Sequence, residues 1–99
     1  MSWRVRYTPA ARDDIKRLYD FLLDHDIIAA QHALKAIVEG VDILRQFPFA
    51  CRKVDPGNPL LRELLVSFGA SGYVLVYEID DEHTVTILAV RHQREDDYH

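Results

Sequence analysis

Cysteine is almost absent from this 99-residue chain, in which Cys51 is the only one. A single cysteine excludes a disulfide within the chain, and this fits a reducing compartment. The sequence shows no base close to Cys51 that would activate its thiol, so we interpret it as a structural residue. Long hydrophobic runs are also missing. No segment approaches the ~20 apolar residues of a membrane-spanning helix, and residues 1–4 do not begin a signal peptide, so we expect a cytoplasmic protein.

Lysine is scarce as well. The chain has three lysines and nine scattered arginines, and its net charge is −4 at pH 7. Proteins whose main partner is DNA or RNA gain affinity by neutralising several phosphates with basic residues, so we do not expect direct nucleic-acid binding as the main activity. The length, with 48% hydrophobic and 28% charged residues, is typical of one globular domain over residues 1–99.

The first half of the chain has the pattern of one strand and two helices. Residues 3–7 alternate apolar and charged side chains, as a strand with one exposed face does. Thr8 and Pro9 are typical of a helix start, and residues 24–26 indicate a turn. Apolar residues follow at helical spacing on both sides of that turn: Ala11, Ile15, Leu18 and Leu22, then Ala30, Ala33, Leu34, Ile37, Val41 and Leu44. Since Pro48 ends the second series, we expect a helical hairpin.

The second half has the pattern of strands. Residues 48–59 contain three prolines and a glycine, and we predict a loop for them. Three strands are then expected, at 61–68, 73–79 and 84–90. The middle one is apolar at nearly every position, which predicts a central strand covered on both faces. The order β-α-α-β-β-β predicts an α+β domain, with an N-terminal helical hairpin packed on one face of a small, mainly antiparallel sheet.

Residues 91–99 form the densest group of polar side chains in the chain. Arg91, His92, Arg94 and Tyr98 lie there with three carboxylates. His92 could transfer a proton, or it could cap the end of the sheet with a hydrogen bond. The two arginines could bind a partner, or they could lie in solvent beside the carboxylates. These alternatives decide whether the segment is catalytic, a contact surface or a solvated end.

Two other groups have simpler interpretations. Asp24, His25 and Asp26 are adjacent in a turn, and no further ligands are evident elsewhere, so we expect neither a metal nor a cofactor. Tyr73 and Tyr77 share one face of a strand that has no neighbouring lysine or arginine. We therefore interpret them as packing residues rather than as a stacking platform for nucleobases.

Five phrases, taken in order, resemble the ParE/RelE superfamily of toxins from bacterial type II toxin–antitoxin modules, which include plasmid-stabilisation systems. They lie at 8–15 (TPAARDDI), 44–48 (LRQFP), 61–64 (LREL), 71–77 (SGYVLVY) and 85–92 (VTILAVRH). The resemblance spans nearly the whole chain and implies the same fold. It also implies one of two activities. RelE-like members are ribosome-dependent mRNA endonucleases, whereas ParE-like members inhibit DNA gyrase without cutting RNA.

The RelE-type site maps incompletely onto this sequence. That site has lysines on the strand before the Gly-Tyr phrase, an arginine directly after it, and an arginine and a tyrosine near the C-terminus. Here Val74 stands at the arginine position, and the preceding strand has no lysine. Only Arg94, with Tyr98 or His92, matches, so the cationic stabilisation that RNA cleavage needs is largely missing. The chain resembles the ParE-like branch more closely.

The resemblance therefore implies a toxin that inhibits DNA gyrase by binding, rather than an enzyme. We expect Arg91, His92, Arg94 and Tyr98 to contact the target. A cognate antitoxin would neutralise the toxin, and a heterotetramer of the two is one assembly that the resemblance allows. The expected antitoxin contacts are Trp3 and the first helix, at Ile15 and Leu18. Two alternatives stay open: a metal-independent mRNA endonuclease with His92, Arg94 and Tyr98 in catalytic roles, and a degenerate, non-toxic member.

Overall fold

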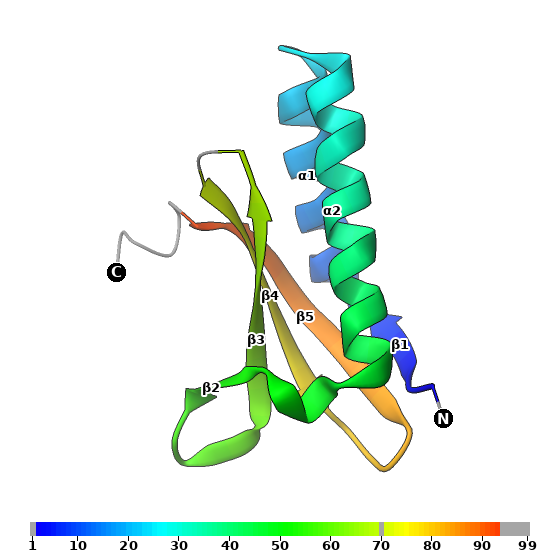
Figure 1. Cartoon of the computed structure of the whole chain (residues 1–99), viewed down its shortest axis with the longest axis vertical. Coiled ribbons are helices and arrows are strands. Elements are labelled where there is room, and N and C mark those ends of the chain that lie inside the picture. The colour runs from blue at the N-terminus through cyan, green and yellow to red at the C-terminus, as the bar shows by residue number, and fades with distance from the viewer. Residues whose placement is uncertain (1, 70, 94–99) are drawn as a thin grey trace.

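The computed structural model describes residues 2–69 and 71–93. A helical hairpin packs on one face of a five-stranded sheet (Figure 1). This arrangement confirms the predicted α+β fold. The elements in chain order are β1 (Arg4–Tyr7), α1 (Pro9–Leu23), α2 (Ile27–Gln46), the short 3-10 helix η1 (Pro48–Ala50), β2 (Arg52–Asp55), β3 (Asn58–Phe68), β4 (Ser71–Ile79) and β5 (Thr84–His92).

The sheet has the strand order β1-β5-β4-β3-β2. Strand β1 is parallel to β5, and the other three pairs are antiparallel, so the sheet is mainly antiparallel as predicted. Strand β4 is central. Tyr73, Leu75 and Tyr77 of β4 are buried against the helices, and Val74 is buried on the opposite face. The continuous apolar pattern of β4 therefore reflects burial on both faces, as expected for a central strand.

Side-chain caps set the starts of both helices. The Thr8 hydroxyl accepts a hydrogen bond from the Ala11 N–H at 3.0 Å, and Pro9 occupies the first helical position. The Asp26 carboxylate accepts from the Ile28 and Ala29 N–H groups at 3.0 and 3.2 Å. The Asp24–Asp26 segment thus separates two helices and starts the second one, which is the structural role that the sequence predicted.

The core lies between the helical hairpin and the sheet. The predicted apolar series supply the helical side of it, with Leu34 as the exception because 40% of its surface is exposed. The strand side comes from alternate positions of β3, β4 and β5. The buried members of this core are Ala11, Leu18, Ala33, Ile37, Val41, Leu44, Val66, Tyr73, Leu75, Tyr77, Ile79, Val85, Ile87 and Val90.

The prediction of a loop over residues 48–59 was wrong. This segment contains η1 and β2, and β3 already begins at Asn58. All four residues of β2 are exposed, so they lack the alternation of apolar and polar residues that reveals a strand. The Asp55 carboxylate accepts from the Gly57 N–H at 2.9 Å and closes the tight β2–β3 turn.

Three other strand boundaries also differ from the prediction. Strand β4 begins at Ser71, two residues before the predicted start. Strand β1 begins at Arg4, so Trp3 precedes it, and the Trp3 N–H donates to the Arg45 carbonyl at 2.7 Å. Strand β5 continues to His92, so Arg91 and His92 lie within the strand and not beyond its end. Among the described residues, neither helix combines the length and the apolar composition that crossing a membrane requires.

Candidate functional site at the end of the sheet

Strand β5 contains a β-bulge that decides where its last side chains point. Val76 pairs with Ala89 and Tyr77 pairs with Ile87, so Leu88 is an extra residue on β5. Val85 and Ile87 face the core before the bulge, and Val90 faces it afterwards. In a regular strand, alternation from Ile87 would turn Arg91 toward the core. Because of the bulge, Arg91 is exposed instead.

Helix α1 holds the bulged segment in place. Strand β1 ends opposite Ile87, so it cannot pair with the rest of β5. The Thr8 hydroxyl donates to the Leu88 carbonyl at 3.2 Å, and the Asp14 carboxylate accepts from the Val90 N–H at 3.0 Å. These side chains replace the missing strand partner, and they position the part of β5 that carries Arg91 and His92.

His92 lies on the face of the sheet that the helices cover. It is paired with Tyr73, and the two rings meet edge to face with their centroids 5.8 Å apart. The Nε2 atom of His92 lies 3.0 Å from the Ser71 hydroxyl oxygen. Phe68 stacks on the other side of Tyr73, also at 5.8 Å. His92 therefore completes a row of three rings and is held by contacts on two sides.

Arg91 lies on the opposite face of the sheet. It pairs with Val74, which in turn pairs with Leu65 of β3. Leu65 is 46% exposed. Successive residues of a strand point to opposite faces, so the structure does not bring Arg91 and His92 together. Arg94 and Tyr98, the other two predicted target contacts, lie outside the described residues.

Positive charge is sparse around this end of the sheet. From residue 63 to residue 93, the sequence contains one arginine, Arg91, and no lysine. Arg62 of β3 is engaged elsewhere, because its guanidinium donates to the carbonyls of Pro59, Phe49 and Cys51 at 2.8–2.9 Å. Leu65 and Val74 therefore have a single arginine beside them on this face, Arg91.

Two tyrosines of β4 belong to the core behind the site. Tyr73 and Tyr77 are both almost fully buried, as the interpretation as packing residues predicted. Burial raises the pKa of each phenol above its ordinary value, and Tyr77 also donates a hydrogen bond to the Pro48 carbonyl. Within residues 2–69 and 71–93, no three His, Cys, Asp or Glu side chains come together in a group that could hold a metal.

The predicted antitoxin contacts lie in three different environments. Leu18 is only 8% exposed and belongs to the core. Ile15 lines a shallow hollow of about 370 Å³ together with Tyr7 of β1 and other residues of the two helices, among them Leu34. Trp3 lines a separate groove, with Phe49 of η1 and Leu60 of β3. Sequence reasoning missed Phe49 and Leu60, and the only available signal was apolar residues beside prolines in a segment interpreted as a loop.

The fold matches chains of two solved toxin–antitoxin systems. One chain of the chromosomal ParDE system from P. aeruginosa matches it with a TM-score of 0.71 at 18% identity, covering 92% of this chain and 96% of that chain. A chain of the RelBE2 toxin–antitoxin complex from Mycobacterium tuberculosis matches with a TM-score of 0.62 at 29% identity, covering 93% and 99%.

Sequence comparison identifies the family. The model of the ParE toxin of type II toxin–antitoxin systems, parDE, matches residues 5–97. Toxin RelE3 of Caulobacter vibrioides is 36% identical over 91 residues, which cover 92% of this chain and 95% of that protein. Toxin RelG of Mycobacterium tuberculosis is 37% identical over 99 residues, covering 94% and 93%. The chain therefore belongs to the ParE toxin family, within the ParE/RelE superfamily, and the predicted resemblance is confirmed.

Proposed function

We propose that this protein inhibits DNA gyrase by binding it, and that a cognate antitoxin neutralises it. The observation that carries the proposal is the scarcity of arginine and lysine at the end of the sheet, where Arg91 is the only one of either between positions 63 and 93. Cutting RNA without a metal requires groups that activate the 2′-OH, stabilise the charge on phosphorus and protonate the leaving oxygen. Arg91 and Arg94, with no lysine on the neighbouring strands β3 and β4, do not supply that set.

The same surface suits a protein partner. Leu65 is exposed beside Val74, and Arg91 pairs with Val74 on the same face. Apolar residues with a neighbouring arginine are typical of contact surfaces between proteins. The match to the ParE family model supports gyrase as the target, because gyrase inhibition is the activity that the ParE-like resemblance implies. The fold neighbours from toxin–antitoxin systems support an antitoxin as the second partner.

An mRNA endonuclease is the second candidate, and two observations favour it. The relatives that share more than a third of their residues with this chain carry the names RelE3 and RelG. In addition, His92 has its Nε2 atom 3.0 Å from the Ser71 hydroxyl, an arrangement that could hold an imidazole for proton transfer. Arg91, however, lies on the opposite face and does not complete a site around His92.

Expression of the chain without an antitoxin, with DNA and RNA analysed from the same cells, tests these candidates. Gyrase inhibition by binding predicts growth arrest, DNA double-strand breaks and an SOS response, while mRNA stays intact. Cleavage of mRNA at ribosome-bound codons would contradict the proposal and support the endonuclease. Normal growth would contradict both and indicate a degenerate member of the family.

Substitution of the C-terminal arginine tests the target contacts. We expect Arg94→Ala to abolish growth arrest with the fold unchanged by circular dichroism, because it removes a charge from the proposed contact segment. Lys35→Ala, at an exposed position of α2, is the matched control and should stay fully toxic. A fully toxic Arg94→Ala protein would refute the site assignment. His92→Gln tests the catalytic alternative, because an endonuclease that uses this imidazole for proton transfer would lose mRNA cleavage.

A further inference from the structure

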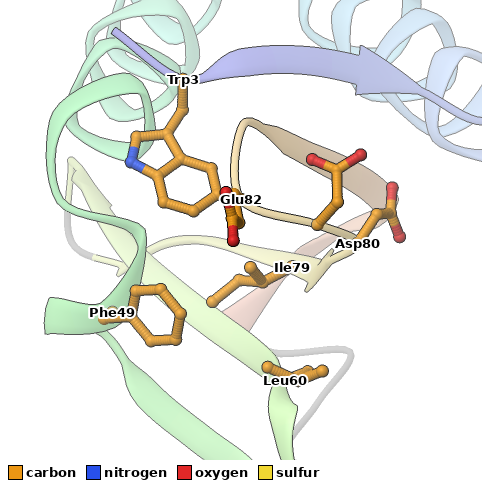
Figure 2. A pocket seen from close by; sticks show the side chains of 7 residues that line it. Trp3, Phe49, Leu60, Ile79, Asp80 and Glu82 are labelled. Carbon is orange, nitrogen blue, oxygen red and sulfur yellow. The ribbon is translucent and has the colours of Figure 1, made fainter. Parts of the chain in front are cut away.

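The second surface of interest is a groove at the other end of β4 from Tyr73 and His92, which we call the Trp3 groove. It has a volume of about 460 Å³. Figure 2 shows Trp3 and Phe49 on one side of the groove and Asp80 on the other. Seven residues line it: Trp3, Phe49, Leu60, Ile79, Asp80, Asp81 and Glu82.

The apolar lining of the Trp3 groove is open to solvent. Phe49 is 53% exposed and Leu60 is 43% exposed, whereas Ile79 forms a buried floor. Trp3 and Phe49 meet edge to face with ring centroids 6.0 Å apart. Exposed aromatic and aliphatic side chains around a hollow of this size are typical of a pocket for a bulky apolar anchor.

The segments that carry the aromatic wall are held by several contacts, although the wall is exposed. Arg62 lies over the Phe49 ring, 5.3 Å from its centroid, and donates to the Phe49 carbonyl at 2.9 Å. The Tyr77 hydroxyl donates to the neighbouring Pro48 carbonyl, and the Trp3 N–H donates to the Arg45 carbonyl. A partner therefore meets a wall that is already ordered, which reduces the entropy cost of binding.

The opposite rim carries three consecutive carboxylates, Asp80, Asp81 and Glu82, in the β4–β5 turn. The turn is closed by a hydrogen bond from the Asp80 N–H to the Thr84 carbonyl at 3.0 Å. Arg6 neutralises Asp80 in part, at 3.4 Å. The Asp81 carboxylate accepts the His83 N–H at 2.7 Å, and this bond lowers the pKa of Asp81. Within the described part of the chain, no ion pair engages Glu82. The rim therefore keeps a net negative charge at neutral pH.

We propose that the Trp3 groove binds a segment of a partner protein in which a bulky apolar side chain is flanked by lysine or arginine. The apolar anchor would fill the hollow between Trp3, Phe49 and Leu60, and the flanking cations would face Asp81 and Glu82. Charge complementarity selects this occupant over an acidic or purely apolar segment. The antitoxin as the source of the segment rests on the proposed function, whereas the binding preference rests on the groove alone.

Selection of peptides from a random phage-displayed library on the purified chain tests the preference directly. The expected result is enrichment of peptides that carry an aromatic or long aliphatic residue beside lysine or arginine. Their affinity should fall as salt concentration rises, since part of it is electrostatic. Failure to enrich any peptide, or enrichment of acidic or uncharged sequences, would overturn the proposal.

Three variants locate the selected peptides on the surface. Phe49→Ser and Glu82→Lys should each weaken binding by about tenfold or more, because one removes the anchor contact and the other reverses a rim charge. Asp13→Lys makes the same charge change on the exposed side of α1 and should bind as the wild type does. Undiminished binding to Phe49→Ser and Glu82→Lys, with both proteins folded by circular dichroism, would overturn the proposal, as would dimers of this chain that Phe49→Ser dissociates.

The growth experiment separates this proposal from the proposed function. If the protein selects peptides with an apolar anchor beside lysine or arginine but causes no growth arrest, the toxin activity is refuted and the groove proposal stands. If the protein causes growth arrest with DNA breaks but the library yields no peptide that depends on the groove, the groove proposal is refuted and the toxin activity stands.

Discussion

Two adjacent aspartates of α1 show how much the position of a single side chain decides. Asp13 is exposed, and its charge lies near Lys16. Asp14 is half-buried and accepts the Val90 N–H of β5 at 3.0 Å, with Arg17 at 3.7 Å from its other oxygen. The sequence predicts both residues as ordinary acidic residues near the start of a helix. Their different roles arise from the helical rotation between them and from the strand end that lies against α1.

We expect Asp14→Ala to lower the free energy of unfolding by about 1–3 kcal/mol, because it leaves the Val90 N–H without its acceptor. Asp13→Ala is the matched control and should change the free energy of unfolding by less than about 0.5 kcal/mol. Urea unfolding followed by circular dichroism measures both. Equal stability of the two variants would show that the Asp14 contact contributes nothing.

At the scale of elements, the start of α1 and the bulge of β5 depend on the same hydroxyl group. Thr8 accepts from the Ala11 N–H as the helix cap, and it donates to the Leu88 carbonyl at the bulge. The Thr8 N–H also donates to the Ile87 carbonyl at 3.0 Å. One residue thus joins the last residue of β1, the first turn of α1 and the irregular part of β5. The sequence predicts the cap but not the bond to β5.

Thr8→Val keeps the shape of the side chain and removes both hydroxyl bonds. We expect the free energy of unfolding to fall by about 1–2 kcal/mol from loss of the cap alone, with faster hydrogen exchange at Ala11. Thr8→Ser, which keeps the hydroxyl, should lose much less stability. The shared role of this hydroxyl would be disproved by a valine variant as stable as the serine variant.

For the whole molecule, the packing of helices on the sheet encloses several tyrosines. Burial raises the pKa of Tyr7, Tyr73 and Tyr77 in the folded protein. An unfolded chain ionises its tyrosines near pH ~10. The folded state therefore retains protons that the unfolded state releases at alkaline pH, so these residues stabilise the fold fully below about pH 10 and progressively less above it.

Tyr77→Phe should lower the free energy of unfolding at neutral pH, but it should reduce the loss of stability above pH ~10. At neutral pH we expect a loss of about 1–3 kcal/mol, because the Pro48 carbonyl loses its donor. Above pH ~10 the variant should lose stability less steeply than the wild type, since one buried phenol no longer ionises on unfolding. Chemical unfolding across this range, with tyrosinate absorbance as a second readout, measures the difference. Parallel curves for the two proteins would contradict the prediction.

Local patterns were sufficient to predict the helical hairpin and the central strand, and the resemblance of five phrases indicated the family. Helical spacing, the Thr8–Pro9 start and the apolar run of β4 each depend on residues close together in the sequence. The residues buried in the structure follow the same apolar pattern. Strand β2 was not predicted because all four of its residues are exposed, so its sequence shows no alternation of apolar and polar residues. Its pairing with β3 depends on the tight turn at residues 55–58 rather than on hydrophobic alternation.

The arrangement of the site depends on contacts between segments that are far apart in the sequence. The polar residues after Val90 are visible in the sequence, and strand alternation separates Arg91 from His92. The bulge at Leu88, which the sequence does not reveal, decides which of the two faces the helices. Trp3 and Phe49 form one groove because the N-terminal strand and η1 meet beside the β4–β5 turn. Local sequence encodes periodicity and caps through neighbours along the chain. The face on which each functional side chain lies, and its neighbours, depend on contacts between segments far apart in the sequence. Such contacts produce no local pattern from which they could be predicted.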